Sequence, residues 1–128
     1  MAPAETEFGD RMSLGIPLDS AHIATARLFA GGVARSLELA EEEAEVLRLT
    51  LTEVCSEAVE RRREGRILID VWPEPDQIRV KVEANGPPNE QSLGDPIEAS
   101  FRRTLIEALA PDVTFVEEKN RSSASFSL

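Results

Sequence analysis

The sequence has few of the residues on which several classes of protein depend. It contains no tyrosine, one cysteine and one histidine. The single cysteine, Cys55, excludes a disulfide framework within the chain and a cysteine-based zinc site. The single histidine, His22, excludes clusters of histidine ligands and relays of several histidines. We therefore expect no metal site built on these side chains.

Long apolar runs are also lacking. No stretch approaches the roughly 18 apolar residues that a membrane-spanning helix needs. The first dozen residues show no basic segment followed by an apolar stretch, so we expect no secretory signal. We predict a cytoplasmic location without membrane contact.

Positive charge is scarce, because 14 Lys and Arg stand against 24 Asp and Glu, which gives a net charge of −10. Nucleic-acid binding requires a cationic footprint, so we expect no nucleic-acid partner. The one basic cluster is Arg61 to Arg63 with Arg66. It is interpreted either as a solvated helix end or as a contact site for an acidic partner. The overall negative charge would also suit docking onto a basic protein.

Apolar residues make up 41% of the 128 residues, which suffices for one core. We predict a flexible N-terminus over residues 1–10 and a single domain over residues 11–128. Hydrophobic spacing then separates helices from strands. It predicts strands at 11–18, 66–72, 77–83, 113–117 and 123–128, and helices at 21–37, 41–64 and 97–109. A turn at 73–76 and a lid-like loop at 85–96 join these elements.

The predicted order is β-α-α-β-β-α-β-β. This order favours an α+β fold, a two-layer sandwich with helices on one face of a mostly antiparallel mixed sheet. Gly65 should end the second helix. Gly31-Gly32 weakens the first helix and indicates a kink or a close approach. The residues expected to face the core are Ile23, Ala26, Leu28, Phe29, Val33 and Leu37 in the first helix, Leu47, Leu51, Val54 and Ala58 in the second, and Phe101, Leu105, Ile106 and Leu109 in the third.

Four strings of residues follow one another along the chain in a distinctive order. They are LRLTLTEVCSEAVE in the second helix, VEANGPP at the exit of the first hairpin, TLIEALAPDVTF after the loop, and the terminal SSASFSL. Together they resemble the histidine-kinase-like ATPase fold, and within it the small anti-sigma-factor serine/threonine kinases of bacterial partner switching. The resemblance covers residues 11–128.

The resemblance implies where a nucleotide site would lie. Glu53 matches the general base of these kinases, and Glu57 stands where the family has a magnesium-binding Asn. Ala84 replaces the Asp that binds the adenine amino group. Gly86 matches the first glycine of its box, whereas the second is Pro88.

Two more positions depart from the family pattern. The glycine-rich turn that approaches the phosphates should fall near residues 100–102, where the sequence has no glycine. The glycine of the last box is replaced by Ser122 or Ser123.

These departures weaken the expected nucleotide site. Losing an amine-to-carboxylate hydrogen bond of about 1.5–3 kcal/mol lowers affinity roughly ten- to a hundredfold. Glu57 adds a charge that repels both a polyanion and Glu53, one helical turn away. Pro88 removes an amide donor. We therefore expect no cofactor and no metal, with Glu57, Ala84 and Gly86 as vestigial nucleotide-binding positions; Mg-ATP would bind only if the site still functions.

The leading hypothesis is an anti-sigma-factor-like regulatory protein that binds a sigma factor or an anti-sigma antagonist without ATP. The resemblance also implies a homodimer. The alternative is an active ATP-dependent serine/threonine kinase, in which Glu53 takes the proton from a substrate serine and Glu57 binds magnesium. A third hypothesis is an α+β binding module unrelated to the family. In a purely structural interpretation, Glu53 and Glu57 are exposed helix charges and residues 86–88 are a strand-exit turn.

Overall fold

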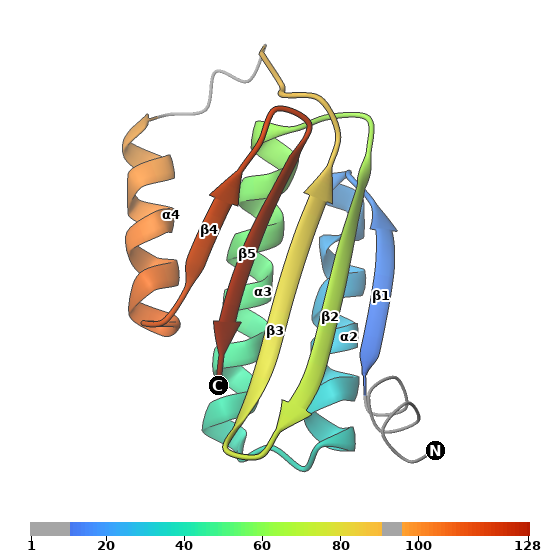
Figure 1. The fold of residues 1–128 in the computed structure, drawn as a ribbon, viewed down its shortest axis with the longest axis vertical. Coiled ribbons are helices and arrows are strands. Elements are labelled where there is room, and N and C mark those ends of the chain that lie inside the picture. The colour runs from blue at the N-terminus through green and yellow to red at the C-terminus, as the bar shows by residue number, and fades with distance from the viewer. Residues whose placement is uncertain (1–10, 91–95) are drawn as a thin grey trace.

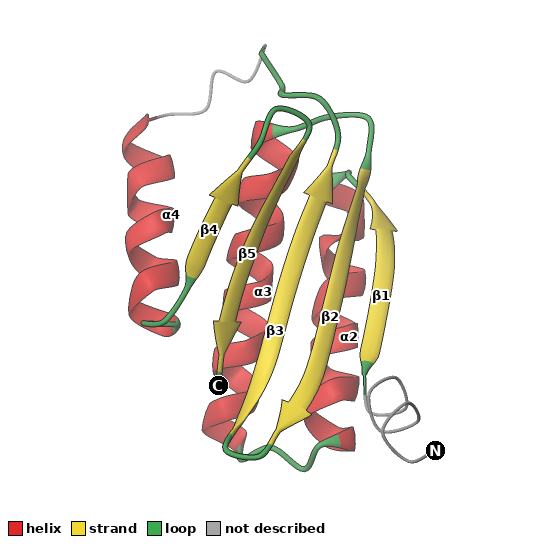
Figure 2. Cartoon of the chain, viewed as in Figure 1, coloured by secondary structure: helices red, strands yellow, loops and turns green. Residues whose placement is uncertain are grey.

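The computed structural model describes residues 11–90 and 96–128. These residues form a five-stranded sheet with α2 and α3 on one face and α4 beside the β4 edge (Figures 1 and 2). The elements in chain order are β1 (Met12–Pro17), the 3-10 helix η1 (Ser20–His22), α2 (Ile23–Ser36), α3 (Glu41–Arg61), β2 (Arg66–Glu74), β3 (Gln77–Asn85), α4 (Pro96–Leu109), β4 (Thr114–Glu117) and β5 (Arg121–Ser127). The α+β sandwich and the predicted element order are confirmed. The predicted flexible segment 1–10 and residues 91–95 of the predicted lid loop lie outside the described residues.

The sheet has the order β1-β2-β3-β5-β4, and all of its described pairings are antiparallel. Alternate residues of each strand face the helices, as the period of two requires. On β2, Ile67, Ile69 and Val71 are fully buried. The residues between them, Leu68 and Asp70, face away from the helices and are more exposed.

The hairpin between β2 and β3 is tighter than predicted. Its register runs to Glu74 opposite Gln77, so only Pro75 and Asp76 form the turn. The predicted four-residue connection is therefore wrong, because Pro73 stays within β2. The pairing of β1 with β2 ends at Val71, so at Pro73 the strand is paired with β3 alone, a position that proline tolerates.

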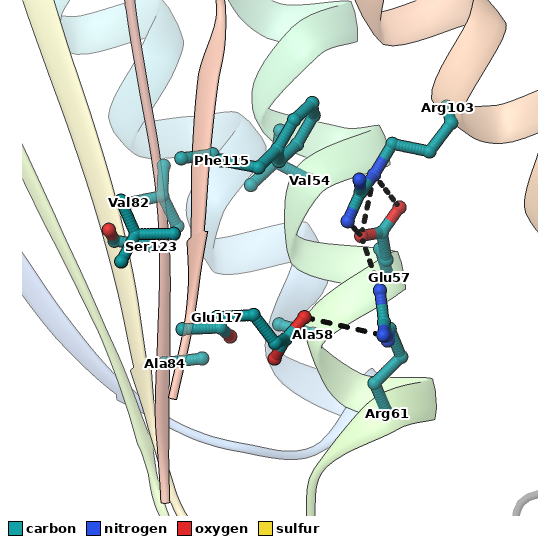
Figure 3. Close-up of a pocket in the computed structure, with 13 residues that line it drawn as sticks. Val54, Glu57, Ala58, Arg61, Val82, Ala84, Arg103, Phe115, Glu117 and Ser123 are labelled. Carbon is teal, nitrogen blue, oxygen red and sulfur yellow. Dashed lines mark hydrogen bonds and ion pairs between the residues drawn. The ribbon is translucent and has the colours of Figure 1, made fainter. Parts of the chain in front are cut away.

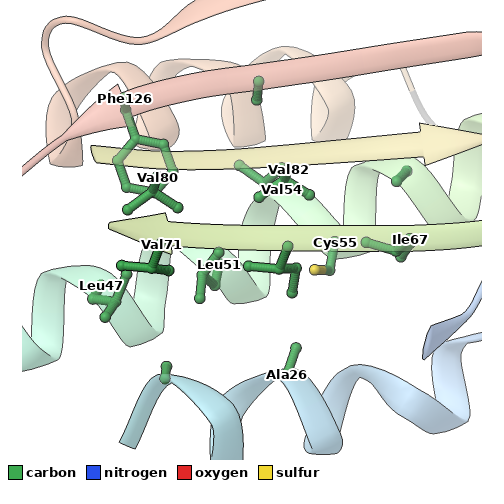
Figure 4. Close-up of a cluster of buried hydrophobic side chains, with 14 of the residues drawn as sticks. Ala26, Leu47, Leu51, Val54, Cys55, Ile67, Val71, Val80, Val82 and Phe126 are labelled. Atoms are coloured by element: carbon green, nitrogen blue, oxygen red, sulfur yellow. The ribbon is translucent and has the colours of Figure 1, made fainter. Parts of the chain in front are cut away.

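The core lies between the sheet and the two helices α2 and α3 (Figure 4). Leu47 and Leu51 are fully buried, and Val54 and Ala58 continue the same stripe toward the end of the helix. The predicted core face of α3 is thus confirmed. Leu28 on α2 and Phe101 on α4 were also predicted to face inward, and this is wrong, since they are 78% and 69% exposed.

Gly31 and Gly32 lie inside a continuous α2. A Cβ atom added at either position would meet nothing within 4 Å among the described residues. No other part of the described chain therefore approaches these glycines closely, although the sequence predicted a kink or a close approach there. Each glycine in a helix interior costs about 1 kcal/mol relative to alanine, and the internal packing gives no reason for this cost.

α3 ends at Arg61, three residues before the predicted end. Arg62 is extended, and the residue with positive φ is Glu64 rather than Gly65. Gly65 is instead needed because the chain passes close to the end of β3 at this point. A Cβ there would lie 1.6 Å from the carbonyl oxygen of Asn85. The assignment of Gly65 as a helix-ending glycine is therefore wrong.

Among the described residues, no helix is long and apolar enough to cross a membrane.

Cys55 is fully buried on α3, as the sequence predicted, and burial raises the pKa of its thiol to about 12. Since only the thiolate is nucleophilic, we expect a thiol reagent at pH 8 to label the native protein very slowly. In denaturant, labelling should become rapid and stoichiometric. Labelling of the native protein at the rate of the denatured chain would contradict this description of α3.

Candidate functional site

A small hollow lies between α3, the sheet and α4 (Figure 3). It encloses about 30 Å³ of free space. Its lining residues come from α3, β3, α4, β4 and β5; they are Val54, Glu57, Ala58, Arg61, Val82, Ala84, Arg103, Phe115, Val116, Glu117, Ser122, Ser123 and Ala124. Two of the predicted site positions, Glu57 and Ala84, therefore meet in this hollow.

Glu57 is held by arginine side chains. Its carboxylate accepts from Arg103 at 2.6 Å through Nη2, and at 3.1 and 3.2 Å through Nε. Arg61, one turn further along α3, lies 3.5 Å from the same carboxylate. The Glu57 side chain is only 13% exposed, so this charge is compensated inside the protein rather than by water.

Arg103 is fixed from a second side by an aromatic ring. Its guanidinium carbon lies 3.7 Å from the centre of the Phe115 ring on β4. A guanidinium at this distance is attracted to the ring face. The side chain that reaches from α4 toward the hollow is thus held between the Glu57 carboxylate and Phe115.

Glu53 has its own arginine partner on α4. Arg102 approaches it at 3.3 Å through Nε and donates to Glu60 at 2.6 Å through Nη1. The hydrogen bond to Glu60 raises the pKa of the Arg102 guanidinium. The repulsion expected between Glu53 and Glu57 is therefore opposed by two consecutive arginines, which we call the α4 arginine pair (Arg102 and Arg103).

The α4 arginine pair also shows what replaces the expected glycine-rich turn. Residues 100–102 lie inside α4, which begins at Pro96, and do not form a turn before it. The segment immediately before α4 is 91–95, outside the described residues. The position predicted for phosphate contacts thus carries helical side chains, one of which binds the carboxylates of α3.

Ala84 and Gly86 lie at the end of β3. Ala84 is 2% exposed and stands opposite Ser122 of β5. A Cβ at Gly86 would lie 2.5 Å from the carbonyl oxygen of Arg63, so this glycine is required where the chain passes the end of α3. Pro88 pairs with Arg62 in an isolated β-bridge.

Arg62 is the residue that the sequence analysis missed. It was grouped with a solvated helix end or an acidic-partner site, and this is wrong, because it is 3% exposed. An arginine has five N–H donors, so at least one is shared among its six acceptors. These are Gly86 O and Lys119 O (2.9 Å each), Ser122 Oγ and Arg121 O (3.0 Å each), Glu118 O (2.6 Å) and Glu117 Oε2 (2.5 Å). Its burial could have been predicted from the spacing, because Arg62 follows the buried Ala58 by four residues and so continues the same side of the helix.

A profile of the histidine kinase-like ATPase domain matches residues 16–122. The chain belongs to this family. The hypothesis of an unrelated α+β module is therefore wrong. No curated protein matches the sequence.

The described residues of this histidine kinase-like ATPase domain contain no group of three or more His, Cys, Asp or Glu side chains that could hold a metal ion. What the arrangement provides is a set of charge pairs between α3 and α4. The carboxylates at positions 53 and 57 both belong to this set.

Arg62 should be essential to stability. Replacing it in an Arg62→Met variant removes a buried guanidinium that donates to four backbone carbonyl oxygens, so the free energy of unfolding should fall by about 3 kcal/mol or more. Chemical denaturation measures this. The neighbouring Arg63 is exposed, and Arg63→Met should change the free energy of unfolding by less than about 0.5 kcal/mol. Equal losses in the two variants would contradict the assigned role.

The Glu57–Arg103 pair should be stronger than an exposed ion pair. A double-mutant cycle with Glu57→Gln and Arg103→Gln should give a coupling energy of about 1–2 kcal/mol, because both groups are partly desolvated. The matched control is Glu45 with Arg48 on α3, whose side chains are 52% and 41% exposed. The coupling energy of that pair should be about 0.5 kcal/mol or less, and it should fall to zero in 1 M salt. Similar values for the two cycles would argue against a special pair at the hollow.

Proposed function

We propose that this protein is a non-catalytic regulatory member of the histidine kinase-like ATPase domain family, which acts by binding a protein partner and no longer binds ATP. The single observation that carries the proposal is that Arg103 lies at the hollow and pairs with Glu57. Glu57 is the position that the family resemblance assigns to magnesium.

The space in the hollow supports the proposal. A more open hollow of about 540 Å³ lies next to it and is lined in part by Glu57, Glu60, Arg61 and Arg103. The hollow beside Ala84 holds only about 30 Å³, against about 300–1,000 Å³ for pockets that bind small molecules and cofactors. The smaller volume accommodates a water molecule or two, not a purine base. A nucleotide would first have to displace Arg103 from both Glu57 and Phe115.

The donor and acceptor set supports it as well. Ala84 provides a methyl group where the adenine amino group requires an acceptor. Glu57 already accepts from Arg103, and a bound magnesium ion would have to compete with that guanidinium for the same carboxylate oxygens. The residues present therefore do not fit Mg-ATP, and no phosphoryl-transfer step is derived through it.

The retained carboxylate at the base position is also occupied. Glu53 accepts from Arg102 at 3.3 Å, so a guanidinium group already lies where a substrate hydroxyl would have to approach this carboxylate. A kinase in which Glu53 removes a proton from serine would need this contact to break. The active-kinase alternative thus requires both members of the α4 arginine pair to leave their partners.

The partner class follows from the resemblance. A sigma factor or an anti-sigma antagonist is the proposed partner, in the cytoplasm, with a homodimer as the proposed assembly. The net charge of −10 favours a partner surface that is basic.

Nucleotide binding tests the proposal. A ligand at about 100 times its dissociation constant would stabilise the fold by about 2.7 kcal/mol, or about 10 °C for a domain of this size. We expect no shift in melting temperature with 5 mM Mg-ATP or Mg-ADP. The comparison is a triple variant with Glu57→Asn, Ala84→Asp and Arg103→Ala. It restores two family residues and removes the arginine, so it is the variant in which nucleotide should most readily raise the melting temperature.

Two results would overturn the proposal. One is a shift of several degrees for the unmodified protein with Mg-ATP. The other is transfer of the γ-phosphoryl group to a serine of an anti-sigma antagonist, lost in Glu53→Gln.

A further inference from the structure

A further hollow lies between α2 and the N-terminal part of α3, away from Glu53, Glu57 and Ala84. It is open to solvent and has a volume of about 750 Å³. In Figure 1 this is the end of the helical layer where α2 leads into α3. Its lining residues are Gly31 of α2 and Glu41, Glu42, Ala44, Glu45, Val46 and Arg48 of α3. We call it the α2–α3 groove.

The wall that α2 contributes to this groove is bare backbone. Gly31 and Gly32 are exposed, and neither has a neighbour within 4 Å of the position of a Cβ. Neither glycine has the positive φ that would require it. Glycine in a helix lowers stability but lets another backbone come close. Since nothing in the described chain uses that closeness, the glycine pair fits an outside partner.

An exposed apolar side chain continues the same face of α2. Leu28 is 78% exposed and lies three residues before Gly31, hence on the same side of the helix. Val46 provides a half-buried apolar surface from α3. Val46 thus lines the groove itself, and Leu28 lies on α2 one helical turn before Gly31, where a helix seated over the glycine pair would also contact it.

The rim of the groove determines the charge of its occupant. Glu41, Glu42 and Glu45 line it, and the only cation lining it, Arg48, is already bonded to Glu45. Within the described part of the chain, Glu41 and Glu42 have no ion-pair partner. Their place in the first turn of α3 suits the helix dipole, but it leaves their carboxylates available to a cation.

We infer that the α2–α3 groove is a docking site for a basic amphipathic helix of a protein partner. The helix passes over Gly31 and Gly32, its apolar side chains rest on Leu28 and Val46, and its Lys or Arg side chains pair with Glu41 and Glu42. This is helix-in-groove recognition, with charge selecting the partner. The inference rests on the proposed function, since it names the surface through which the protein binds its partner.

A synthetic peptide tests the groove directly. The probe is a fluorescein-labelled 14-residue helix with leucine on one face and lysine on the other, titrated at 150 mM salt. We expect saturable binding by fluorescence anisotropy, with amide NMR shifts confined to α2 and the first half of α3. An acidic peptide with glutamate in place of lysine, and a scrambled peptide of the same composition, should bind at least tenfold more weakly.

The glycine variants give the sharpest readout. Gly31→Ala with Gly32→Ala should raise the melting temperature, because alanine favours the helix and meets no clash. The same variant should weaken peptide binding at least tenfold, since the added methyl groups hold the peptide backbone away. A loss of binding in a more stable protein cannot come from misfolding.

Charge variants distinguish binding at the groove from attraction of the peptide by the protein's overall negative charge. Glu41→Gln with Glu42→Gln should weaken binding at least fivefold. The matched control is Glu64→Gln with Glu107→Gln, which removes the same charge from exposed positions elsewhere and should change affinity less than twofold.

Three outcomes would overturn the inference. They are no binding at millimolar peptide, unchanged affinity in the glycine double variant, or shifts centred on another surface. None of them bears on nucleotide binding, so the proposed function stands or falls separately with the Mg-ATP experiment.

Discussion

The position of a buried guanidinium group, that of Arg62, determines how the chain segments around the C-terminal end of α3 are arranged. Burying a cation is unfavourable unless its donors are satisfied. Here the donors are satisfied by oxygens of four segments, namely the exit of β3, the end of β4, the loop before β5, and β5 itself. These segments must therefore stay together at the end of α3. The early end of α3 belongs to the same arrangement, because the extended backbone of Arg62 also pairs with Pro88.

This arrangement gives a structural reason for two glycines near the end of α3, one of which, Gly86, the resemblance matches to a glycine box. Gly65 and Gly86 stand where two chain segments cross, and a side chain at either would strike backbone. Gly86 is thus fully accounted for by folding. The same end of α3 presents Glu53, Glu57 and Glu60 toward α4, and α4 buries a single side chain of its own, that of Ile106. α4 is therefore attached both by Ile106 and by the α4 arginine pair, and the arginine pair closes the hollow with charged groups.

Local patterns in the sequence are sufficient to predict the elements but not the contacts between distant ones. The alternation of residues 77–83 on β3 and the apolar stripe of α3 depend on residues close together in the sequence, and both were predicted correctly. Leu28 and Phe101 were misplaced because helical spacing shows which residues share a face, not whether another element covers it. The bond of Arg62 to Ser122 joins residues 60 positions apart, and that of Arg103 to Glu57 joins residues 46 apart. No local rule connects such pairs. For the same reason Glu53 and Glu57 could be identified by motif, while their partners on α4 could not.

The glutamates at the two ends of α3 differ in whether they have ion-pair partners. Near its C-terminus, Glu53, Glu57 and Glu60 are paired with arginines, so little of their charge is available to a ligand. Near its N-terminus, Glu41 and Glu42 stand beside the α2–α3 groove without an ion-pair partner in the described chain. An approaching cation is attracted most by carboxylates that are not already compensated. If the protein no longer binds a nucleotide, then its fold still provides a helix, α3, whose glutamates are paired with arginines near one end, whereas Glu41 and Glu42 near the other end are unpaired in the described chain. Recognition of a basic partner would accordingly move to the N-terminal end of α3, where the exposed glycine pair of α2 also leaves the closest access to the backbone.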